Sequence, residues 1–293
     1  MKSSDALTGY IMMLISSCAF AAQNALAVYS YESGATPLTL VTIRVLFTLG
    51  ALWILMKIAG LSVPLPKRER NAALGIGLLN AFMAFSLMSS IEHIPIGLAI
   101  LVFYLYPVFT GLGAWVTGQE KLNIGLVVGL GGGFIGLSLA LDVTGAIPNT
   151  LGIGLAALAS VLMAGVVLIS ARILKTNNSR SVTLHMHLSG AILFILMTAF
   201  WGSIDLPKTS IGWMGFVGVL IFYTIAVASF FAGIAYIGAV RASLVMNLEP
   251  IASIVLGFAL LSQVLTLQQL LGALIVIAAV TAVKWLSGKK TEN

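Results

Sequence analysis

Charged residues are scarce in this chain of 293 residues: Asp, Glu, Lys and Arg make up 8% of it, against 59% hydrophobic residues. Soluble domains contain about 25% charged residues, so a soluble globular fold is excluded. Cys18 is the single cysteine, which excludes an intramolecular disulfide, and in its apolar run it is interpreted as a small buried hydrophobe. The composition therefore indicates an integral membrane protein.

Motifs of soluble catalysis are missing as well. The sequence contains no Walker A motif, no zinc-binding His-Glu-x-x-His pattern and no nucleophile elbow. The glycines between 125 and 136 lie inside an apolar run and do not follow a strand, so they are not a dinucleotide-binding loop. We therefore expect no cofactor, no metal site and no catalytic residues, and the protein is not expected to be an enzyme.

Long hydrophobic runs, in contrast, are abundant. A helix that spans a bilayer needs about 20 apolar residues, and turn or charge signals such as those from Pro64 to Arg68 separate the runs. We expect an all-α integral membrane protein with ten transmembrane helices, near residues 8–30, 37–58, 71–91, 95–117, 122–141, 150–172, 181–201, 211–236, 240–262 and 266–287.

Basic residues are distributed unequally between the two sides of this topology. Ten helices place both termini on one side, and all of the 15 Lys and Arg except Lys208 and Arg44 fall on that side. By the positive-inside rule the N and C termini are cytoplasmic. This topology accounts for the net charge of +6, so no nucleic-acid partner is expected. We expect a multi-pass protein of the plasma membrane, meaning the bacterial cytoplasmic (inner) membrane, with the lipid bilayer and a small-molecule substrate as partners.

An internal repeat becomes visible when the sequence is shifted by 143 positions. The shift pairs identical residues: Ala99 with Ala242, Leu101 with Leu244, Leu105 with Leu248, Pro107 with Pro250, and Gly129 with Gly272. Residues 1–145 and 146–293 are thus predicted to form two five-helix repeats, the second inverted because five is odd. Inverted repeats and interrupted helices are typical of secondary transporters. Pro107 and Pro250, near the middle of their spans, are the predicted helix breaks.

Several short motifs fit one family pattern. They are Pro37 with Arg44, Tyr104-Leu105-Tyr106-Pro107, Glu120, Gly129 with Gly133, and Leu248-Glu249-Pro250. Together they resemble the drug/metabolite transporter superfamily, in particular proteins with two EamA-type domains. The resemblance implies a ten-helix carrier of small metabolites whose central cavity is lined mainly by helices one, three, four, six, eight and nine. It implies no particular substrate, and Phe20, His185 and His187 depart from the pattern.

Two charged residues lie within predicted spans. Glu249 is near the midplane, about 14 Å deep at 1.5 Å per residue, where a charge costs at least about 2.5–3.5 kcal/mol. It is a candidate for binding substrate or the coupling proton, and the alternative is a structural carboxylate bonded to a neighbouring helix. Arg44 is about 10 Å from the opposite surface. It could snorkel, bind an anionic group or pair with a carboxylate, and pairing is favoured.

The repeat also relates uncharged candidates. Tyr104 and Tyr106 are about 200° apart on a helix, so one is expected to line the cavity while the other packs. By the offset of 143, Tyr104 corresponds to Asn247 and Tyr106 to Glu249. One half would therefore supply an aromatic wall and the other half polar groups, a combination that suits a substrate with an apolar or planar body and a polar group.

The remaining candidates are amides and glycines inside spans. Gln23, Asn24 and Asn80 need hydrogen-bond partners in hydrocarbon, and interhelical bonding explains each as readily as ligand contact. The smooth face of helix five is expected to pack within the fold, with a homodimer seam as the alternative, so the protein is a monomer or a homodimer. This face contains Gly125, Gly129 and Gly133.

The sequence therefore predicts a secondary-active permease or exporter that works by alternating access. An amino acid or a related compound is the favoured substrate, because the predicted cavity is lined by tyrosine and is mostly neutral. Proton coupling through Glu249 is a hypothesis based on its depth. The alternatives are a facilitated carrier, an importer of a flat vitamin such as riboflavin and, from another class, an intramembrane enzyme.

Overall fold

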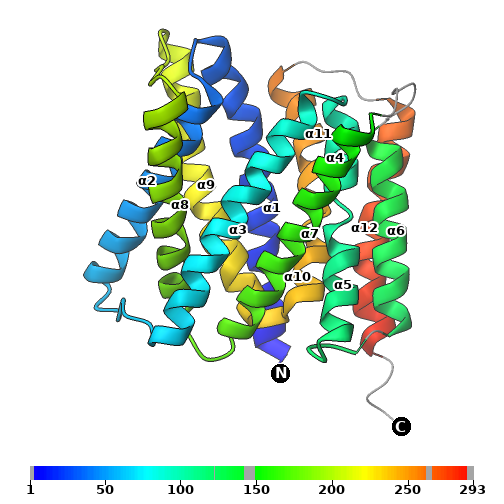
Figure 1. Ribbon diagram of the computed structural model, residues 1–293. Coiled ribbons are helices and arrows are strands. Elements are labelled where there is room, and N and C mark those ends of the chain that lie inside the picture. Colours follow the sequence, from blue (N-terminus) through cyan, green and yellow to red (C-terminus); the bar gives the residue numbers. More distant parts are fainter. Residues whose placement is uncertain (1–2, 122, 142–148, 262–265, 289–293) are drawn as a thin grey trace.

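The computed structural model describes residues 3–121, 123–141, 149–261 and 266–288. Its regular elements within these ranges are all helices (Figure 1): α1 (Ser3–Glu32), α2 (Pro37–Ile58), α3 (Lys67–Ile91), α4 (Ile96–Phe103), α5 (Tyr106–Val116), α6 (Ile124–Ala140), α7 (Thr150–Ile173), α8 (Ser179–Trp201), α9 (Ser210–Ile237), α10 (Ala239–Val245), α11 (Leu248–Leu261) and α12 (Leu267–Gly288). The all-α prediction is confirmed.

Ten membrane spans are also confirmed in the described ranges. Eight are long and apolar enough to cross a bilayer, and α6 and α12 are shorter apolar helices. Two of the eight consist of two consecutive helices: α4 with α5, and α10 with α11. The expected division between residues 145 and 146 lies outside the described residues.

The two halves have opposite orientations. In Figure 1, α1 begins and α12 ends at the same, lower end of the bundle, which we call the terminal side. Each half has five spans, so the second half enters the membrane from the other side. Contacts follow the same symmetry: α1 packs on α9 and α3 on α7, while α6 packs on α12 and α2 on α8, their counterparts. The bundle is therefore a pair of interlocked inverted repeats.

Both broken spans are interrupted about one turn before a proline. α4 ends at Phe103 and α10 ends at Val245. At the breaks, amide hydrogen bonds skip to the third residue back, from Leu105 to the carbonyl of Val102 at 3.2 Å and from Asn247 to that of Leu244 at 3.1 Å. Pro107 and Pro250 then lie in the first turns of α5 and α11, where a missing N–H removes no helical bond.

The glycine face of α6 is covered within the chain. Gly125, Gly129 and Gly133 are buried, as is Gly136. A Cβ atom on Gly136 would lie 2.7 Å from the backbone nitrogen of Val276 on α12, so only glycine permits this close approach. The face thus packs inside the fold, as expected.

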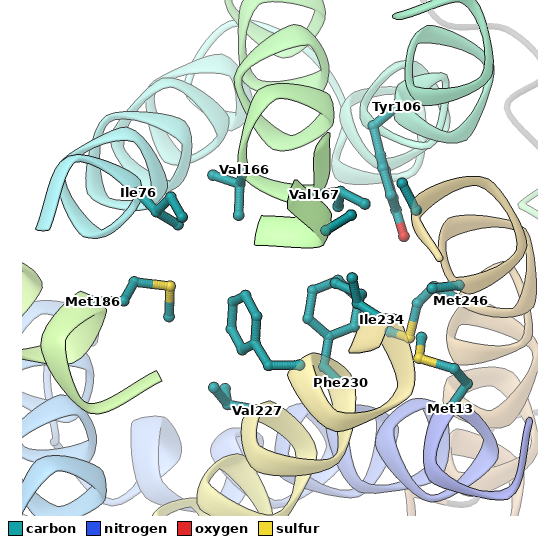
Figure 2. Packing of buried hydrophobic residues seen from close by; sticks show 14 of the residues in the cluster. Met13, Ile76, Tyr106, Val166, Val167, Met186, Val227, Phe230, Ile234 and Met246 are labelled. Atoms are coloured by element: carbon teal, nitrogen blue, oxygen red, sulfur yellow. The ribbon is translucent and has the colours of Figure 1, made fainter. Parts of the chain in front are cut away.

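The hydrophobic core lies between the halves. Figure 2 shows side chains from both halves that converge on the middle of the bundle, including Met13 of α1, Tyr106 of α5, Met186 of α8, Phe230 of α9 and Met246 at the second break. The largest cluster of buried residues draws on these helices together. Any cavity in this region therefore lies at the interface between the two repeats.

Candidate functional site

A cavity of about 280 Å³, here called the central cavity, lies where the two halves meet. Its lining includes seven aromatic residues and five methionines, contributed by both halves. All six spans that the family resemblance implies contribute residues to the cavity lining. The second and seventh spans, α2 and α8, contribute as well. Flat rings and flexible thioethers make a surface that adapts to an apolar or aromatic body.

Polar groups lie at this cavity in a connected series. Arg44, Asn80 and Glu249 line it directly. Arg44 Nη1 donates a hydrogen bond to Gln23 Oε1 at 3.1 Å. Gln23 Nε2 donates to Asn24 Oδ1, and Asn24 Nδ2 donates to Glu249 Oε1 at 3.3 Å. A guanidinium from α2 and a carboxylate from α11 are thus joined through two neighbouring amides of α1.

Glu249 has a second partner at the break between α4 and α5. The hydroxyl of Tyr104 donates a hydrogen bond to its carboxylate. Tyr104 and Tyr106 are both buried and both line the cavity, with their ring centroids 5.8 Å apart. We expected one of them to pack elsewhere, which is wrong: the helix ends between them, so the 100° step of a continuous helix does not apply.

Arg44 pairs with an aromatic ring and an amide. Its guanidinium carbon lies 4.4 Å from the centroid of the Tyr223 ring, a cation–π contact. Within the described residues, Nε of Arg44 is buried without a hydrogen-bond partner, and no ion pair joins Arg44 to Glu249. The favoured pairing of Arg44 with a carboxylate is therefore indirect, through Gln23 and Asn24. Its guanidinium retains donor capacity next to the cavity.

Asn247 lies outside the cavity lining. It is buried at the second break, and its amide faces the glycine surface of α6: a Cβ on Gly133 would lie 2.7 Å from Asn247 Nδ2. Of the eight candidates, Arg44, Asn80, Tyr104, Tyr106 and Glu249 line the cavity, while Gln23 and Asn24 connect its charges.

Tyr223 belongs to the site but was not singled out from the sequence. Tyr223 of α9 lies under Arg44, and its ring faces His187 of α8 at a centroid distance of 5.9 Å. His187, which departs from the family pattern, is 3% exposed, and its Nδ1 bonds to the carbonyl of Thr183 at 2.9 Å. A tyrosine hydroxyl in an apolar span needs a polar neighbour, and that signal could have identified Tyr223.

The central cavity is closed toward the terminal side. Along α9, Tyr223, Phe230 and Phe231 line it, and the next inward-facing residues, Ile234 and Ile237, are 1% and 2% exposed. Glu249 and Arg44 are partly exposed and Asn24 is exposed. Ile234 and Ile237 therefore form a hydrophobic plug between the terminal side and the polar groups, which are at least partly exposed.

Comparisons with known proteins agree with this architecture. A family model described as the EamA-like transporter family matches residues 7–141 and again residues 150–285. One solved structure, described as the crystal structure of a protein, is similar to this chain, with 22% sequence identity and a TM-score of 0.80. The match covers 98% of this chain and 100% of the chain in that structure. At that identity the likeness shows the fold alone. No curated protein matches the chain.

Proposed function

This chain belongs to the EamA-like transporter family, a family of membrane transporters and not of enzymes, and on that premise we propose that it transports a small zwitterion, an amino acid with an apolar or aromatic side chain. The proposed mechanism is alternating access, in which the inverted halves rock about the central cavity. The broken spans, with their buried irregular backbone at the cavity, are the elements about which such rocking can occur.

The observation on which the proposal rests is the series from Arg44 through Gln23 and Asn24 to Glu249. A guanidinium binds a carboxylate through paired N–H donors, and a carboxylate binds an ammonium group. The two ends of the series therefore match the two charges of an amino acid, while Tyr223, the other rings and the methionines face its side chain.

Cavity size favours an amino acid over a flat vitamin. Pockets for drug-sized ligands measure about 300–1,000 Å³, and the central cavity, at about 280 Å³, is just below that range. A fused three-ring vitamin such as riboflavin with its polyol chain would need more room. The riboflavin importer therefore becomes an outcome that the experiment below can detect.

Glu249 also suits proton coupling. Its carboxylate is bonded to Tyr104 and Asn24, both uncharged, so its charge is left for the substrate ammonium or for a proton. Binding one then opposes binding the other, which is the condition for exchange of substrate against protons. We place the protein in the plasma membrane with cytoplasmic termini, because the basic residues gather on the terminal side.

The test is transport by the full-length protein in proteoliposomes under an imposed pH gradient. Labelled phenylalanine and leucine should accumulate against their own gradient, and phenylethylamine and phenylpropionate, which each lack one charge, should compete at least tenfold more weakly. Arg44→Gln should lose this discrimination against the amine. Accumulation of riboflavin without amino-acid transport would overturn the substrate assignment, and transport that ignores the pH gradient would favour a facilitated carrier.

A further inference from the structure

A second cavity, the inner cavity, lies beyond the plug on the terminal side. It measures about 330 Å³ and is bounded by the α5–α6 connection, the end of α7 and the corner between α9 and α10. Phe231 lines the central cavity and Ile234 lines the inner one. Ile234 is three positions beyond Phe231, a rise of about 4.5 Å along the helix axis. The two cavities are thus successive compartments along the same helix.

The inner cavity contains charges of both signs. Glu120, from the α5–α6 connection, accepts a hydrogen bond from the backbone N–H of Val240. Arg241 and Lys175 line the same cavity and act on the carboxylate electrostatically. In the part of the chain that the structure describes, no ion pair joins Glu120 to either cation. The carboxylate and the cations therefore face a common space without neutralising each other directly.

This arrangement repeats the chemistry of the central cavity with the halves exchanged. In the central cavity the guanidinium, Arg44, comes from the first half and the carboxylate, Glu249, from the second. In the inner cavity the carboxylate, Glu120, comes from the first half and the guanidinium, Arg241, from the second. The volumes of the two cavities are close, about 280 and 330 Å³.

The corner between α9 and α10 is shaped to leave room for Glu120. Gly238 has a φ of +80°, a backbone conformation that residues with a Cβ rarely adopt. A Cβ at this position would lie 2.5 Å from Glu120 Oε1. Burial raises the pKa of Glu120 above its ordinary value, while Arg241, the Val240 amide and Lys175 act in the opposite direction. An ammonium ligand would compensate the burial of this carboxylate.

We propose that the inner cavity is a second binding site for the transported zwitterion, with its ammonium group at Glu120 and its carboxylate at Arg241 and Lys175. The apolar walls at Leu126 and Ile234 would then face the side chain of the substrate. The site lets the substrate pause between the terminal side and the central cavity. The assignment rests on the proposed function, because the ligand is the amino acid proposed there.

The experiment uses cysteine protection in full-length protein with Cys18→Ser. Ala235→Cys places a thiol on the exposed lining of the inner cavity, and Met163→Cys places one at the central cavity. Phenylalanine should slow maleimide labelling of both thiols at least fivefold. Adding Arg241→Gln or Glu120→Gln should abolish protection at position 235 and leave protection at position 163 intact, which also shows that the variants fold.

Arg180→Gln, an exposed basic residue outside the cavity lining, is the matched control and should change nothing. Protection at position 163 alone would overturn the inner site and leave the proposed function standing. Protection at position 235 that survives both Arg241→Gln and Glu120→Gln would also overturn it, since a general conformational response would explain that result. Absence of protection at both thiols would overturn the proposed substrate class, and the inner site with it.

Discussion

The two helix breaks have the same backbone geometry but carry different side chains. At each, an amide bonds to the third residue back and a proline follows within the next turn. The first break presents a cluster of rings, with Phe103 5.5 Å from Tyr106 between centroids. The second presents Glu249 to the cavity and Asn247 to α6. Duplication has thus preserved the geometry while the side chains have diverged.

The difference teaches how an inverted repeat can bind an asymmetric molecule. Two identical breaks would offer the same groups from both sides and would suit a symmetric ligand. Here the hydroxyl of Tyr104 from the first break and Asn24 of α1 both orient the carboxylate from the second. Each break therefore depends on the other, and variants can separate their contributions.

The largest effect is expected at Glu249. Glu249→Gln removes the charge that would bind ammonium or a proton while keeping a similar shape. The hydrogen bond between a carboxylate and the substrate ammonium is at the upper end of the range for charged groups, about 3 kcal/mol, so its loss predicts a decrease of about 100-fold in pH-driven uptake. Initial rates in proteoliposomes, with and without the pH gradient, measure it.

A matched control is Glu32→Gln, a carboxylate at the exposed end of α1 that should leave uptake unchanged. Uptake by Glu249→Gln that still responds fully to the gradient would remove Glu249 from coupling. The second break would then be structural, like the packing of Asn247, and the proposed division of chemistry between the breaks would fail.

A smaller effect is expected at the first break. Tyr104→Phe removes the hydrogen bond to Glu249, worth about 1.5 kcal/mol at the lower end for charged partners, and so predicts about a tenfold weaker apparent affinity for phenylalanine. Tyr106→Phe is the matched control, because Tyr106 lines the same cavity and its ring lies 5.8 Å from that of Tyr104. Equal losses in both variants would show that the loss does not come from the hydrogen bond between Tyr104 and Glu249.

Much of this architecture can be predicted from local patterns in the sequence. Apolar runs of bilayer length predicted ten spans, and the offset pairing Pro107 with Pro250 predicted the inverted repeat. The depth of Glu249 and Arg44 also follows from counting residues along a helix. These features depend on the spacing of residues along the chain, so they can be predicted from a single sequence.

What the sequence could not show depends on which helices become neighbours. Arg44 and Glu249 are linked by Gln23 and Asn24 because α1 passes between α2 and α11, a fact of packing that no spacing encodes. The burial of His187, likewise, depends on Tyr223 of α9 lying beside it. Tertiary packing thus selects among polar residues that look equivalent in the sequence.

The smallest effect concerns Asn247, whose role distinguishes packing from binding. Gly133→Ala would place a methyl group 2.7 Å from Asn247 Nδ2. Because the end of the amide can move, the cost should be near the lower end for overpacking, about 1 kcal/mol. Gly131→Ala, at a position with nothing within 4 Å, has the same gain in helix propensity without the clash. The thermal midpoint of Gly133→Ala in detergent should therefore fall below that of Gly131→Ala, while both keep the substrate preference of the natural chain.

If Gly133→Ala instead alters that preference with no loss of stability, Asn247 takes part in substrate selection and the second break contributes two polar groups to the site.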